Sequence, residues 1–193
     1  MIEITSEERL FVYSWLSNVL GHELSKQQLE QYQNGSFDEF FDFLAQQGFS
    51  EEIKGIKQSL SDIKEREFSH LELAADYTQL FLLDGEVSAL PYASVYLDEV
   101  ELSKNLAFLD DLLIEFGLQV NKETHEPSDH LCVYIELLIK IIESSDQELE
   151  QEFVQIYFLP WLQRFVLKVK GIKTQTDFYP QIINILVGLL SKA

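Results

Sequence analysis

The sequence predicts an all-α protein, and three patterns support this class. Apolar residues recur at three- and four-residue steps along most of the chain, and no pair of segments alternates as paired strands do. Six glycines follow the periodic segments, as residues that end helices do: Gly21, Gly35, Gly48, Gly85, Gly117 and Gly171. Five Ser or Thr residues precede a Glu or Gln by three positions, the capping box that begins helices: Thr5 with Glu8, Ser25 with Gln28, Ser36 with Glu39, Ser69 with Glu72 and Ser145 with Glu148.

Five helices are expected in the first part of the chain, at 6–20, 26–33, 37–47, 51–66 and 70–83. The first has an apolar side that includes Leu16 and Leu20, and the third is rich in phenylalanine. The fourth is the most amphipathic, because its isoleucines and Leu60 share one face while its lysines share the other.

The middle of the chain predicts an ordered loop at 89–96. Pro91 disfavours the helical conformation at Leu90, and the segment is rich in aromatic residues. A long helix is expected at 100–116, followed by a polar hinge.

The last part of the chain predicts four more helices. A central apolar helix begins near residue 128, after Pro127, which suits a first helical position. An acidic helix is expected at 146–158, then a break at Pro160 and a helix that carries Arg164. The last helix begins near residue 177, with Pro180 in its first turn, where proline is tolerated.

These elements make about nine to ten helices, in a single bundle-like unit or in two helical subdomains joined at a hinge. The predicted parts are residues 1–117, a hinge loop at 118–127, and residues 128–193. If the hinge straightened, the last helices could pack on a neighbour's first ones, so a domain-swapped homodimer is a hypothesis.

Composition limits the partners. The 193 residues carry a net charge of −19, which disfavours nucleic acid and anionic membranes and favours a basic partner. The single cysteine, Cys132, permits no internal disulfide. The beginning of the sequence lacks the features of a secretory signal, and the longest apolar run is too short to cross a bilayer. We therefore expect a cytoplasmic protein without membrane insertion.

The segment 126–138 combines polar residues with the most apolar helix of the chain. His130 shares a helix face with Tyr134 and Leu137. A polar imidazole ring on that face needs a hydrogen-bond partner or a position in a crevice. Glu126, Asp129 and His130 could cap the helix and brace the preceding loop, or they could form part of a binding site.

Three segments together resemble one family, the TorD/DmsD/NarJ chaperones for bacterial molybdoenzymes. The segments are 71–82, with Ala-Ala-Asp-Tyr-x-x-Leu-Phe; 90–96, Leu-Pro-Tyr-Ala-Ser-Val-Tyr; and 126–138, with Glu-Pro-x-Asp-His-Leu. Their order and spacing agree over nearly the whole chain. The residues of these three segments are most similar to the TorD branch, whose client is trimethylamine N-oxide reductase.

The resemblance implies an all-helical protein without cofactor. We expect no catalytic residues and no metal ligands, because the sequence has no phosphate-binding loop and no nucleophile motif. It implies cytoplasmic binding of the client's twin-arginine signal peptide and of the apo-molybdoreductase, with export delayed until molybdopterin is inserted. The residues expected to bind the signal peptide and the client are Asp76, Tyr77, Leu80, Phe81, Pro91, Tyr92, Ser94, Tyr96, Glu126, Pro127, Asp129 and His130.

The residue chemistry is consistent with this role, because a basic and apolar peptide needs carboxylates beside an apolar groove. We expect Asp129 to contact a signal arginine and His130 to fix the loop geometry. The alternative for Asp129 is a charge at the start of its helix.

Two other functions stay open. Glu126, Asp129, His125 and His130 could form a metal-dependent active site, although no Glu-x-x-His pair recurs on a second helix. A helical adaptor for a folded, basic partner is the second alternative. The basic residues near the C-terminus, such as Arg164 and Lys168, are expected on a solvated face, where they could pair with Glu148, Glu150 and Glu152.

Overall fold

The computed structural model describes residues 4–118 and 128–192. The helices are α1 (Ser6–Gly21), α2 (Lys26–Gln33), α3 (Asp38–Leu44), α4 (Ser50–Lys64), α5 (Ser69–Phe81), α6 (Glu99–Glu115), α7 (Leu131–Ser144), α8 (Gln147–Glu152), α9 (Leu159–Lys170) and α10 (Phe178–Leu190). Two π-helical turns join α3 to α4 and α8 to α9, so these ten segments make eight continuous helical stretches within the described residues. The predicted all-α class is confirmed.

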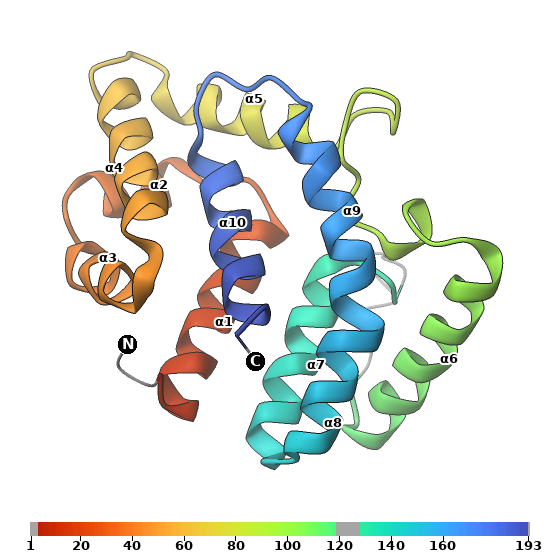
Figure 1. The fold of residues 1–193 in the computed structure, drawn as a ribbon. Coiled ribbons are helices and arrows are strands. Elements are labelled where there is room, and N and C mark those ends of the chain that lie inside the picture. The colour runs from red at the N-terminus through yellow and green to blue at the C-terminus, as the bar shows by residue number, and fades with distance from the viewer. Residues whose placement is uncertain (1–3, 119–127, 193) are drawn as a thin grey trace.

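The centre of the molecule is the contact between α1 and α7, which run along each other (Figure 1). Eight of the fourteen residues of α7 are buried, which explains why its sequence is largely apolar. The expectation that it is the most apolar helix is wrong, because α10 has eight of its thirteen residues buried and carries no charged side chain. On one side α10 packs against α4 and α9, and on the other α6 lies at the edge of the molecule. The buried side chains form one continuous core.

The two parts predicted on either side of the hinge therefore share this core, since α1 and α4 belong to the first part and α7 and α10 to the second. The structure has the form of a single unit over the described residues. Within the predicted hinge, 118–127, only Leu118 is described, so the hinge and the swapped homodimer stay predictions.

Proline and glycine explain where the helices depart from expectation. Pro160 lies in the first turn of α9, where a missing N–H is harmless, and the chain enters α9 directly from the π-helical turn. The predicted break at Pro160 is therefore wrong. Gly48, at φ 96°, provides the kink between α3 and α4 that a side chain would resist.

The capping boxes predicted at the helix N-termini are only partly confirmed. Thr5 and Ser25 form complete capping boxes at α1 and α2. Ser36, Ser69 and Ser145 do not cap: the residues at those starts are Phe37, Phe68 and Asp146. An unpredicted capping box, Asp98 with Glu101, begins α6.

No helix in the described part of the chain has both the length and the apolarity that crossing a bilayer requires.

Candidate functional site

The loop after α5 is attached to the start of α7 by backbone hydrogen bonds. The N–H of Leu131 donates to the Pro91 carbonyl (2.8 Å), and the N–H of Ala93 donates to the Asp129 carbonyl (3.0 Å). These two bonds place Tyr92 opposite His130 in an antiparallel bridge. Pro91 lacks an N–H, but this bridge uses its carbonyl, so the proline costs no hydrogen bond here. Two of the three segments that carry the family resemblance thus meet directly.

Asp129 supplies a side-chain bond to the same loop. Its side chain is buried, with the residue only 3% exposed, and its Oδ2 accepts a hydrogen bond from the N–H of Ser94 (2.8 Å). This bond lies at the start of the 3-10 turn η2 (Ala93–Val95). Asp129 was predicted to lie in the first turn of this helix. Because α7 begins at Leu131, Asp129 instead precedes the helix. Its carboxylate holds the loop, while its proposed contact with a signal arginine stays untested.

His130 caps α7 and also contacts the loop. Its Nδ1 accepts a hydrogen bond from the N–H of Cys132 (3.2 Å), an N-cap interaction that requires an unprotonated Nδ1. Its ring meets the ring of Tyr92 edge-on, with 5.0 Å between the centroids. This is the geometry required if His130 fixes the loop.

Tyr96 fastens the far end of the loop to α9. Its ring stacks on Trp161, with 6.2 Å between centroids and 21° between planes, and meets Phe165 edge-on. Burial raises the pKa of Tyr96, and its hydroxyl is a buried polar group without a hydrogen-bond partner among the described residues. Arg164 donates to the Tyr96 carbonyl and pairs with Glu101 at 3.0 Å.

This attachment leaves part of the segment 82–100 at the surface. Ser94 is exposed and Tyr92 is half-buried. Eleven large apolar side chains are exposed in the described part of the chain, and five of them fall in this short segment: Leu82, Leu83, Val87, Val95 and Val100. We call the exposed side of residues 82–100 the loop surface. Because it exposes several apolar side chains, this surface offers an apolar partner a contact area that a loop of polar residues would not offer.

The predicted residues of α5 lie beneath this surface, within the core. Leu80 is fully buried, Phe81 is 3% exposed, and Tyr77 donates its hydroxyl hydrogen to the Leu20 carbonyl (3.0 Å). They lie below the loop because the N–H of Ala89 bonds back to the Leu80 carbonyl (2.7 Å).

Asp76 is attached to a different segment, the one that leads into α10. It is 2% exposed, and its carboxylate accepts hydrogen bonds from the N–H of Gln175 (2.7 Å) and from the N–H and hydroxyl of Thr176 (2.8 and 2.7 Å). The structure thus brings Pro91, Tyr92, Ser94, Asp129 and His130 together and places Asp76 elsewhere. Glu126 and Pro127 lie outside the described residues.

Sequence reasoning missed the pairing of Arg164. The expected partners were acidic residues of the 146–158 helix, but Arg164 pairs with Glu101 of α6 instead, and Glu150 pairs with Arg9 of α1. The bonds from Arg164, and one from the N–H of Asp98, lower the pKa of Glu101. Nothing local in the sequence joins these residues, because 63 positions separate Arg164 from Glu101.

No group of His, Cys, Asp and Glu that could hold a metal ion forms among residues 4–118 and 128–192. His125 and Glu126, which belong to the metal-dependent alternative, lie outside these ranges.

The chain matches known proteins over most of its length. A family model described as nitrate reductase delta subunit matches residues 42–167, which include the loop and the start of α7. A chaperone protein TorD from Pasteurella multocida is 55% identical over 98% of this chain and 97% of its own length. One from Histophilus somni is 51% identical over the full length of both chains, and one from Photobacterium profundum is 33% identical over 95% of this chain and 91% of its own length.

Relatives this similar over nearly the whole chain settle its family and confirm the predicted chaperone over an enzyme. The chain belongs to the TorD/NarJ family of molybdoenzyme maturation chaperones.

Proposed function

We propose that this chaperone acts in the cytoplasm, where it binds the twin-arginine signal peptide and the apo form of a molybdoreductase. Binding delays export until the molybdopterin cofactor has been inserted. The client proposed is trimethylamine N-oxide reductase, because the sequence resembles the TorD branch and the relatives carry the TorD name. The observation that carries the proposal is the junction between the loop at 90–97 and residues 129–131, which turns Ser94 and Val95 outward.

The chemistry of the loop surface is complementary to such a peptide. A twin-arginine signal has a basic start followed by an apolar stretch, and the loop surface carries exposed apolar side chains beside exposed carboxylates. Glu86 and Glu99 are exposed, and neither makes an ion pair with another described residue. They are therefore able to receive arginines at little desolvation cost.

Burial divides the predicted site residues into two groups. Ser94 and Tyr92 are accessible and are proposed as direct contacts. Asp129 and His130, which are 3% and 5% exposed, are proposed to act by positioning the loop. The buried α5 residues support it from below, so a peptide need not reach them.

Titration calorimetry with a synthetic twin-arginine signal peptide tests the proposal, at low and at moderate salt. A peptide of the same composition in scrambled order is the control. We expect selective binding that weakens as salt screens the charges. Replacing Glu86 and Glu99 together by Gln should weaken binding about tenfold and reduce its salt dependence.

Equal affinity for the signal and scrambled peptides would contradict the proposal and favour the adaptor for a folded, basic partner. As a control for general loss of charge, Glu51 and Glu52 at the start of α4 are also exposed or half-exposed and lie outside the loop surface. Their replacement by Gln removes the same charge and should leave the affinity within about twofold.

A further inference from the structure

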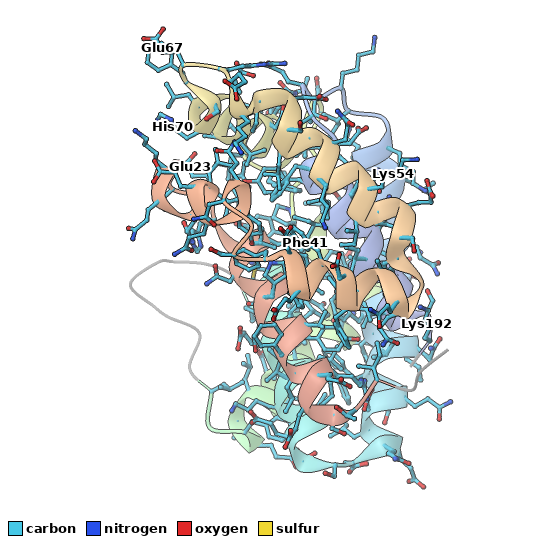
Figure 2. All side chains as sticks on the ribbon, turned by 90° about the vertical axis from the view of Figure 1, so that its left-hand side faces the viewer. Glu23, Phe41, Lys54, Glu67, His70 and Lys192 are labelled. Carbon is cyan, nitrogen blue, oxygen red and sulfur yellow. The ribbon has the colours of Figure 1, made fainter. Side chains whose placement is uncertain are left out.

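A second surface of the molecule has the chemistry of a docking site. An open hollow of about 390 Å³ lies between α1 and α3, lined by three phenylalanines and three glutamates: Phe11, Phe40, Phe43, Glu7, Glu8 and Glu39. We call it the aromatic hollow. Figure 1 places α3 on the opposite side of the molecule from the loop at 90–97, with α1, α10 and α7 between them. Figure 2 looks onto this side, across α3 and its buried Phe41.

The apolar wall of the hollow is supported by the core. Phe11 is 60% exposed and meets Phe40 edge-on at 5.2 Å between centroids, and Phe40 meets Trp15 edge-on at 5.0 Å. Trp15 is itself held by a hydrogen bond to the hydroxyl of Tyr32 (2.8 Å). The wall is therefore preformed, which lowers the entropy cost of binding a partner. Leaving Phe11 largely in water gives the fold little, because most of its side chain buries no area.

The rim of the hollow is acidic, and no basic side chain is among its lining residues. Glu7 and Glu39 are exposed, while Glu8 is fixed in the capping box of α1, where hydrogen bonds from Thr5 lower its pKa. Arg9, the nearest cation along α1, pairs instead with Glu150. The local charge is therefore negative around an apolar centre.

We propose that the aromatic hollow is a second protein-docking surface, which receives an apolar helical segment of a partner with Lys or Arg within one turn of its apolar residues. A groove between two helices suits a third helix, whose side chains at three- and four-residue spacing fill it. Glu7 lies one turn before Phe11 on α1, so a partner cation one turn from its apolar residue meets both groups. The chain's charge of −19 opposes an anionic membrane as the occupant.

The proposal is independent of signal-peptide binding at the loop surface, and separate variants test the two. The probe is a synthetic helical peptide with Leu on one face and Arg near both ends, but without adjacent arginines, and its binding is followed by fluorescence anisotropy. Phe11→Ser should raise the Kd for the probe about tenfold, and Glu7→Gln with Glu39→Gln about fivefold at low salt. Neither change should alter the affinity for the twin-arginine signal peptide.

Phe68→Ser is the matched control, because Phe68 is 56% exposed but lies outside the hollow. It should leave the Kd for the probe unchanged, and a version of the probe with Glu in place of Arg should bind at least tenfold more weakly. An unchanged Kd for the probe in Phe11→Ser would overturn the proposal. So would a loss of signal-peptide affinity in Phe11→Ser, since the hollow would then belong to the signal-peptide site. Concentration-dependent self-association that Phe11→Ser abolishes would also overturn it, in favour of a second copy of the chain as the occupant.

Discussion

Asp76 and Asp129 are two buried carboxylates with different structural roles. Both accept hydrogen bonds from the backbone of a segment distant in sequence, and both are almost fully enclosed. Asp76 accepts three bonds from Gln175 and Thr176, in the connection that leads into the buried helix α10. Asp129 accepts a bond from Ser94, in a loop with one side at the surface.

Burial of an acidic residue therefore does not by itself indicate a ligand site. Asp76 joins two parts of the core, so its loss should reduce stability. Asp129 joins the core to a surface, so its loss should affect stability and binding together.

Asp76→Ala should have the largest effect on folding. It leaves two backbone N–H groups and a hydroxyl without their acceptor in a buried site, which should lower the free energy of unfolding by about 3 kcal/mol. Urea denaturation measures the change. Signal-peptide affinity, measured at a temperature where the variant stays folded, should remain within about twofold of the unmodified chain. Weaker peptide binding at unchanged stability would instead make Asp76 a direct contact.

Asp129→Ala should cost less stability and more binding. The loss of the bond to Ser94 should lower the free energy of unfolding by about 2 kcal/mol, since one backbone donor loses a charged acceptor. Because the loop is then released, signal-peptide affinity should fall about tenfold. Calorimetric titration and urea denaturation of one preparation measure both quantities. An affinity equal to that of the unmodified chain would show that the loop junction is not part of the site.

His130→Ala should remove the N-cap of α7 and lower the free energy of unfolding by about 1 kcal/mol. His130→Asn is the matched variant, because asparagine caps helices well but lacks the ring that contacts Tyr92. His130→Asn should keep most of the stability that His130→Ala loses. Its affinity for the signal peptide should stay as low as that of His130→Ala, because both variants lack the ring. Recovery of both would show that His130 acts only as a cap.

Arg164→Gln should have the smallest effect, because its ion pair with Glu101 is exposed. The pKa of Glu101 is lowered from 4.5, so the pair stabilises the fold above that pH and the contribution is lost as the pH falls below it. The substitution should raise the pKa of Glu101 toward 4.5, as a carbon-detected NMR titration of its carboxyl would show. An unchanged pKa would mean that the bond from Asp98 alone lowers it.

Local patterns predicted the helices well because helix periodicity is a local property. The helix expected at 26–33 has those same bounds, and the apolar segment expected to form a central helix is the largely buried α7. Capping boxes were less reliable: Ser69 fits the motif, but the chain begins α5 one residue earlier, without a side-chain cap. The motif describes which bonds a helix start can make, and tertiary packing decides where the start lies.

The candidate site was harder to predict because its bonds are long-range. The need for carboxylates beside an apolar groove grouped Asp76 with Asp129, and both residues belong to segments rich in apolar residues. Asp76 bonds Gln175, 99 positions away, and no periodicity in the sequence indicates that contact. The aromatic hollow was missed for the same reason, since Phe11 and Phe40 are far apart along the chain and each reads as an ordinary core residue on its helix.

A ¹⁹F NMR titration of the 5-fluorotryptophan-labelled chain with the twin-arginine signal peptide tests most directly whether the peptide binds at the loop surface. The sequence contains two tryptophans: Trp161 packs under Tyr96 of the loop surface, and Trp15 packs under Phe40 of the aromatic hollow. We expect the Trp161 resonance to shift as the peptide saturates the chain, while the Trp15 resonance stays in place. A shift of Trp15 with an unchanged Trp161 would contradict this expectation, because the signal peptide would then occupy the hollow and not the loop surface.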